Sequence, residues 1–329
     1  MGAELRVLRR RIRSVESTKK ITRAQELIAA SRIIRAQQRA EAARPYTRAL
    51  VGALEAAATN ARLDNPLLEG VGEPRRSAVL VVTSDRGFAG AYSANVIRQS
   101  EALSGLLTEQ GQEVRPYVVG QKGVTWFRFR GREMGGEYTG FTGMPGYSDA
   151  RRIADDLLSD INTPTDEGGV DEIHVVATHF VNMVTQEVRA RRLFPIVVED
   201  VPQELHRAEA GAVRSAGEGD SGAGQPTTTD GGGAEVLPLY DFEPSADDVL
   251  DALLPWYAGN LVFTTLLDAA ASEWAARRRA MKSATDNATD LQLEYTRLAN
   301  QARQAEITQE ISEIVGGADA LAAAAAGSE

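Results

Sequence analysis

The stretch LDAAASEWAARRRAMKSATDNATDLQLEYTRLANQARQA, residues 267–305, repeats mostly apolar or small residues at alternating steps of three and four. The series consists of Leu267, Ala270, Trp274, Arg277, Met281, Ala284, Ala288, Leu291, Tyr295, Leu298, Ala302 and Ala305. This spacing is typical of a coiled-coil helix. The pattern fades near Gly316-Gly317, so we expect a helix from about Ser245 to Val315. Such a helix is on the order of 100 Å long, longer than a compact domain, and part of it must project.

The other end of the chain carries a matching stripe. It consists of Leu5, Leu8, Ile12 and Val15, followed in the same register by Ala29, Ile33, Ala36, Ala40, Ala43, Leu50 and Leu54. The stripe is interrupted at Lys19, Thr22 and Glu26, and Pro45 lacks the N–H of an interior helical residue, so we expect a kink or break there. Two such helices can bury their stripes against each other as a long antiparallel coiled coil.

Between these helices, short apolar strands alternate with helices, which predicts a parallel sheet. We expect strands at 77–83, 114–119 and 172–178, helices at 93–109, 121–129 and 149–161, and an added antiparallel strand pair within 183–198. Loops are expected at 162–169 and 207–235. The predicted fold class is therefore α/β, with an inserted Rossmann-like domain. The predicted divisions are a coiled-coil helix (1–60), the α/β domain (75–205), a flexible low-complexity insertion (206–235), a return strand (236–245), a second coiled-coil helix (246–316) and an Ala-rich tail (317–329).

Composition limits the chemistry that this chain can perform. Among its 329 residues there is no cysteine and there are three histidines, which excludes disulfides and thiolate chemistry. The formal net charge is -10, yet residues 1–48 contain 13 Arg or Lys and four Glu, a net of +9. A one-sign run of this length often marks a surface for a partner, and charge alone allows nucleic acid or an acidic protein. No apolar run approaches the ~20 residues of a membrane span, and no targeting peptide is evident.

Individual residues give weak signals of catalysis. The turn Asp85-Arg86-Gly87, with Gly90 close behind, follows a buried strand and could bind phosphate through backbone N–H groups, but a structural turn is the favoured interpretation because no phosphate-loop motif is present. His174 and His179 are five apart on a predicted strand and point to opposite faces. The acidic residues at 247, 248 and 251 are interpreted as complementing a helix dipole. We therefore expect no catalytic site, cofactor or metal.

Four motifs resemble the gamma subunit of F-type, proton-translocating ATP synthase. They are LRVLRRRIRSVESTKKITRA (5–24), TSDRG (83–87), AMKSATDNA (280–288) and ARQAEITQEISEIVGGA (302–318). The resemblance covers nearly the whole chain apart from residues 207–235, and it is closest to bacterial, actinobacterial-like members. It departs from the common pattern at Gln25 and at Phe88-Ala89-Gly90-Ala91.

The resemblance implies a non-catalytic central-stalk rotor that couples proton-driven rotation to conformational changes in catalytic beta subunits. Its implied partners are three alpha and three beta subunits, the epsilon subunit and the membrane c-ring. It implies that Lys20, Ile21, Arg23 and Gln25 face the lever loop of the beta subunits, and that Arg303, Gln304, Thr308 and Gln309 contact the upper alpha/beta ring. The implied location is the cytoplasmic face of a bacterial plasma membrane, with peripheral attachment through the complex alone.

Two alternatives compete with this interpretation. A basic coiled-coil protein that binds nucleic acid would carry aromatic residues among its arginines, and the first 45 residues contain none. A nucleotide-binding enzyme built on the turn at Asp85 would need a phosphate-contacting lysine, which that motif lacks.

Overall fold

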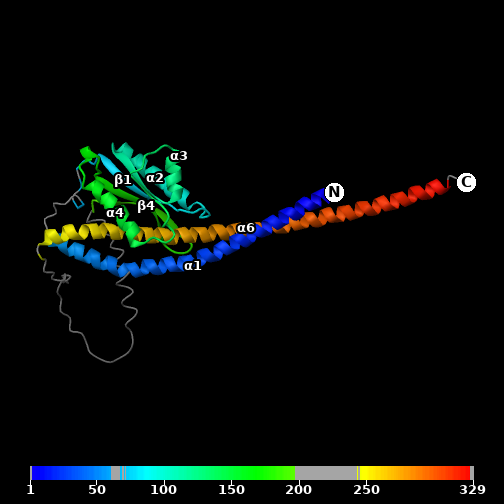
Figure 1. Cartoon of the computed structure of the whole chain (residues 1–329), viewed down its shortest axis with the longest axis horizontal. Coiled ribbons are helices and arrows are strands. Elements are labelled where there is room, and N and C mark those ends of the chain that lie inside the picture. The colour runs from blue at the N-terminus through cyan, green and yellow to red at the C-terminus, as the bar shows by residue number, and fades with distance from the viewer. Residues whose placement is uncertain are drawn as a thin grey trace, which may run out of the picture.

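Two long helices dominate the computed structural model, which describes residues 2–60, 67–68, 70, 72–196, 243 and 245–326. Helix α1 (Gly2–Asn60) and helix α6 (Ala246–Ala326) lie side by side and antiparallel, with an α/β domain at one end (Figure 1). The C-terminal part of α6 extends past the N-terminus of α1 (Figure 1). At 1.5 Å per residue, α6 is about 120 Å long. The predicted antiparallel coiled coil is confirmed.

Helix α1 keeps one heptad register over its whole length. The residues in this register are all buried or half-buried: Leu5, Leu8, Ile12, Val15, Lys19, Thr22, Glu26, Ala29, Ile33, Ala36, Ala40, Ala43, Thr47, Leu50, Leu54 and Ala57. The predicted interruption at Lys19, Thr22 and Glu26 is therefore one of polarity and not of geometry. The helix is also unbroken at Pro45, which lies on its exposed side.

Helix α6 departs from the predicted stripe beyond Met281. The predicted Ala288, Tyr295 and Ala302 remain buried or half-buried, but the positions between them shift by one residue to Thr285, Gln292, Ala299 and Glu306, whereas Leu291 is 41% exposed and Ala305 is exposed. Two successive steps of four, at 277–281–285, replace the expected alternation. Such an insertion locally unwinds a coiled coil. The predicted end near Gly316-Gly317 is also wrong, because α6 continues through these glycines to Ala326.

In its described residues, the inserted domain contains one five-stranded sheet. Its strands are β1 (Arg76–Val82), β2 (Glu113–Val119), β3 (Gly136–Tyr138), β4 (Glu172–Phe180) and β5 (Gln186–Phe194), in the order β3-β2-β1-β4-β5. The first four are parallel and β5 is antiparallel to β4. The strand pair predicted within 183–198 is wrong, because residues 183–196, the described part of this segment, supply one strand, whose partner is β4. The short β3 was not predicted.

Helices cover both faces of the sheet. On one face α2 (Tyr92–Glu109) and α3 (Gln121–Phe129) pack on Val79 and Val81 of β1. On the other, α4 (Tyr147–Ile161) and α6 pack on alternate residues such as Leu80. Helix α6 is therefore both a layer of the domain and half of the coiled coil.

Several predictions concern the segments around these elements. The loop at 162–169 contains a short 3-10 helix, Thr165–Glu167. The insertion at 206–235 lies outside the described residues, as do residues 327–329 and all of the return strand at 236–245 except positions 243 and 245. The Ser245 hydroxyl accepts a hydrogen bond from the Asp248 N–H at 3.1 Å and thus caps α6. Within the described ranges, we find no helix with the length and apolar character of a membrane span.

Candidate functional site

The carboxyl ends of β1 and β4 form the point where the strand order reverses. In doubly wound α/β folds, ligands bind in the crevice at this point. Here α6 lies across it: the Ser272 hydroxyl donates a hydrogen bond to the Thr178 carbonyl at 3.3 Å, and the Tyr92 hydroxyl donates to the Ala269 carbonyl at 3.1 Å. A helix of the shaft therefore occupies the place of a ligand.

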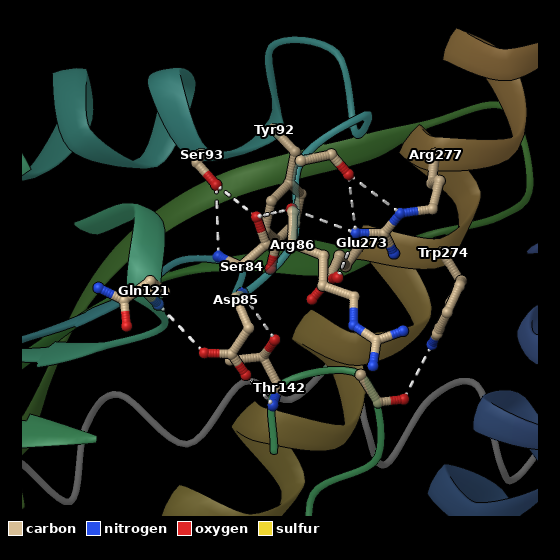
Figure 2. A network of polar contacts seen from close by, with 12 residues as sticks. Ser84, Asp85, Arg86, Tyr92, Ser93, Gln121, Thr142, Glu273, Trp274 and Arg277 are labelled. Atoms are coloured by element: carbon tan, nitrogen blue, oxygen red, sulfur yellow. Dashed lines mark hydrogen bonds and ion pairs between the residues drawn. The ribbon is translucent and has the colours of Figure 1, made fainter. Parts of the chain in front are cut away.

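Asp85, in the turn after β1, is bonded within the domain. Its carboxylate accepts hydrogen bonds from the backbone N–H groups of Gln121, at 3.1 Å, and Thr142, at 3.0 Å (Figure 2). Its own N–H donates to the Thr142 hydroxyl at 3.0 Å. The side chain thereby ties β1 to the start of α3 and to the loop before α4, which is the work of a structural turn and leaves its carboxylate engaged.

Arg277 of α6 reaches the same turn from the shaft. Its Nε and Nη2 atoms donate to the Gly87 carbonyl, and Nη2 also donates to the Arg86 carbonyl, all at 3.3 Å (Figure 2). Nη2 lies 2.7 Å from Oε1 of Glu273, one helical turn earlier. We call the turn at 84–87, together with Glu273, Trp274 and Arg277, the junction.

Trp274 adds further contacts to the junction. The Arg277 guanidinium lies over its ring, 4.6 Å from the centroid, at a distance that favours cation–π attraction. The indole N–H donates to the Gly143 carbonyl at 2.8 Å. The ring also belongs to an apolar cluster with Ala29 and Ile33 of α1. One side chain therefore contacts the domain and both helices of the shaft.

The ion pair at the junction is almost completely buried. Glu273 is 2% exposed and Arg277 is 4% exposed. Burial raises the pKa of Glu273 above its ordinary value, and the nearby Arg277 charge opposes this rise. Burial also raises the pKa of Tyr92, with a further contribution from Glu273. Removal of either charge would leave the other buried and unpaired, which is strongly destabilising.

The sequence identified the turn at 85–87 as structural, but nothing in it joined that turn to α6. Arg277 was predicted as one position in the stripe of α6, while Glu273 was not identified. A charged residue at a seam position of an otherwise apolar or small series was the available signal, since burial of a charge demands a partner.

Four residues of α1 were expected to contact another subunit: Lys20, Ile21, Arg23 and Gln25. In the structure they point away from α6. The Lys20 ammonium lies 2.9 Å from Glu16, one turn earlier, and Arg23 lies 2.8 Å from Glu26. Ile21 is 61% exposed, and Gln25 is also exposed. Charged and apolar groups together on one solvent-facing side of a helix suit contact with another protein.

Behind this exposed face lies a polar layer, which we define as Lys19, Thr22 and Glu26 of α1 with Thr285 and Gln292 of α6. The Thr285 hydroxyl donates to that of Thr22 at 2.8 Å, and the Lys19 ammonium donates to the Gln292 side-chain oxygen at 3.4 Å. Lys19, Thr22 and Glu26 were predicted to interrupt the stripe; Lys19 and Thr22 form hydrogen bonds across it, and Glu26 pairs with Arg23 of its own helix.

The second predicted group lies farther along the shaft. Arg303, Gln304, Thr308 and Gln309 are all exposed on α6. The neighbouring Ala302 and Ala305 line a groove with Glu4 and Leu8, near the start of α1. The structure therefore does not bring the two groups together: they lie at separate levels of one shaft.

The two histidines of β4 form no shared site. His174 lies 3.0 Å from Glu172, and His179 lies 2.8 Å from Asp268 of α6. They are on opposite faces of β4, as predicted. Across the described part of the chain, no group of three potential metal ligands is found.

Taken together, these features define a coiled-coil shaft that carries an α/β domain at its base. The same fold is present in the rotor of the Euglena gracilis mitochondrial ATP synthase, with a TM-score of 0.61 over 93% of this chain and 100% of that chain, at 16% identity. The central stalk of the Tetrahymena thermophila mitochondrial enzyme gives a TM-score of 0.54 over 80% of this chain and 99% of that chain, at 19% identity.

Sequence comparison gives the family. The family model described as ATP synthase matches residues 4–321. The ATP synthase gamma chain of Kineococcus radiotolerans is 53% identical over 98% of both chains, and that of Thermobifida fusca is 52% identical over the full length of both. The gamma chain of Acidothermus cellulolyticus is 54% identical over 98% of this chain and 99% of the relative. The chain belongs to the ATP synthase gamma chain family, as the motifs predicted.

Proposed function

We propose that this chain is the central-stalk rotor subunit of a proton-translocating ATP synthase. Its α6 helix is long enough to leave the α/β domain and project as a shaft, and this observation carries the proposal. The chain is a non-catalytic subunit, and the assembled complex is the enzyme. Rotation of an asymmetric shaft would favour a different conformation of each surrounding catalytic subunit in turn.

The partner surfaces follow from the exposed faces of the shaft. We assign Lys20, Ile21, Arg23 and Gln25 to contact with acidic lever loops of the beta subunits, because the basic segment 1–48 provides complementary charge. Residues Arg303, Gln304, Thr308 and Gln309 would contact the upper ring of three alpha and three beta subunits. The α/β domain would bind the epsilon subunit and the c-ring.

The proposed location is the cytoplasmic face of a bacterial plasma membrane, with attachment through the complex. The actinobacterial relatives agree with a bacterial source. The nucleic-acid alternative gains no support from the family.

Co-purification tests the proposal. A tagged full-length chain expressed in its host should recover a membrane-bound complex with ATPase activity and the other synthase subunits. A variant truncated after Asn300, which lacks the upper contact group, should give a complex with impaired coupling of hydrolysis to proton pumping. Recovery of an isolated monomer that binds nucleic acid with a steep salt dependence would contradict the proposal.

A further inference from the structure

We infer that Arg277 is the positioning residue that locks the α/β domain to the shaft, through its buried ion pair with Glu273 and its hydrogen bonds to the turn after β1. The locking itself rests on geometry, while its consequence, the transmission of torque, rests on the proposed function.

The guanidinium joins segments that are far apart in sequence. It donates to the carbonyls of Arg86 and Gly87, about 190 residues earlier in the chain. A planar guanidinium can bond two neighbouring carbonyls and a carboxylate at once, which a lysine ammonium on a flexible stem does less rigidly. Because this group is shielded from water, its bonds are not in competition with solvent.

The position of Arg277 along α6 matters as much as its bonds. Residues up to Met281 are largely enclosed by the domain and α1, whereas from Lys282 onward exposed residues predominate. Arg277 thus lies in the last turns before α6 leaves the domain. A twisting load between the domain and the projecting shaft is shared by α1 and α6, and the part that α6 carries passes through these turns.

A simple helical salt bridge would explain the pair differently. Glu273 and Arg277 are four residues apart, a spacing at which opposite charges pair on any helix. That alternative predicts that exchanging the two charges preserves the interaction. The locking role predicts that exchange fails, because a carboxylate at position 277 would then face the carbonyls of the turn.

Hydrogen exchange of the full-length chain, measured by mass spectrometry, distinguishes the locking role from the simple helical salt bridge. Arg277→Met should speed exchange in residues 83–92 by at least ~10-fold, since loss of the buried bonds allows local opening. Arg277→Lys should give a smaller increase, and Lys282→Met, an exposed control on the same helix, should give none. Exchange should remain fast in the double variant Glu273→Arg/Arg277→Glu. Restored protection in the double variant, or unchanged exchange in Arg277→Met, would overturn the inference.

Torque is tested in the assembled synthase. With Arg277→Lys, which keeps the charge, the ratio of ATP-driven proton pumping to ATP hydrolysis should fall by at least ~2-fold relative to the Lys282→Met complex. An unchanged ratio alongside faster exchange would overturn the torque role. Failure of the unmodified chain to enter a synthase would count against the proposed function, and the exchange experiment would still decide the locking role.

Discussion

Helix α6 contains two regions that differ in how much of their side chains is buried. Between 246 and 281, large apolar residues such as Leu254 and Leu266 are enclosed by the domain and α1. From 282 to 306, one stripe of mostly small and polar residues faces α1 and most other side chains are exposed, and residues 307–318 are all exposed. Many residues of the first region are buried in the core, and the second region leaves most of its surface available to other chains.

The difference shows how one helix can be anchored in the domain at one end and exposed to other subunits at the other. Anchoring depends on burial and on the junction, which fix the base of the helix. Presentation requires a thin shaft, and small or polar seam residues allow the two helices to approach closely without bulky side chains. Stability should therefore reside in the base and function in the exposed part.

The largest expected effect comes from a matched pair of truncations on this one helix. Leu254 is 1% exposed and Leu293 is 67% exposed. Leu254→Ala should lower the free energy of unfolding by about 2–5 kcal/mol, because it leaves a cavity. Leu293→Ala should change it by less than about 0.5 kcal/mol. Chemical denaturation of both full-length variants checks the contrast, which equal losses would contradict.

The polar layer lies where the two regions meet, and substitutions in it should change the free energy of unfolding by an intermediate amount. Thr22→Val should destabilise the chain by about 0.5–1.5 kcal/mol, because it removes the hydrogen bond between the two helices while the Thr285 hydroxyl keeps the Met281 carbonyl as an acceptor. The double variant with Thr285→Val should be less destabilised than the sum of the two single variants. Strict additivity in a thermodynamic cycle would show that the two hydroxyls are not coupled.

A pH titration examines the base of the molecule separately. The hydrogen bond from His174 lowers the pKa of Glu172 below its ordinary 4.5, and Arg192 contributes. A lowered folded-state pKa gives stability that is present above the unfolded pKa and is lost as pH falls through the folded value. Glu172→Gln should therefore flatten the fall in stability on acidification by about 1 kcal/mol or less. If the melting temperature of the variant fell on acidification as steeply as that of the unmodified chain, the contribution of Glu172 would be refuted.

Substitution at the exposed end should have the smallest effect on stability. Thr308→Ala and Gln309→Ala should each change the free energy of unfolding by less than about 0.5 kcal/mol. If each side chain makes one hydrogen bond to the surrounding ring, ATP synthesis by membrane vesicles should fall by about 2–10-fold. Lost stability with unchanged synthesis would reverse the assignment of the two regions.

Much of this architecture could be predicted from the sequence because periodicity reports burial directly. The stripe beginning at Leu5 and three of the four parallel strands found in the described part of the domain were predicted correctly. The shift of register after Met281 could not be predicted from the sequence, because Ala284 and Thr285 are both acceptable in a seam. The choice between them depends on how α6 first packs on the domain. The Ala-rich end was predicted as a tail because glycine usually ends helices.

The candidate site was less predictable for a physical reason. Exposed groups such as Lys20 and Thr308 came from family motifs, and their contacts with partners remain predictions. The junction depends on a turn at residue 86 that meets a helix at residue 277. Periodicity along either segment alone carries no information about such a meeting.

Rotation of the α/β domain tests the central claim most directly. The chain has no cysteine, so Arg98→Cys on the exposed side of α2 introduces a single attachment point for a bead. In a synthase head assembled with this chain and fixed to a surface through its catalytic ring, added ATP should turn the bead continuously in one direction. ATP hydrolysis at the normal rate with a stationary bead would contradict the account.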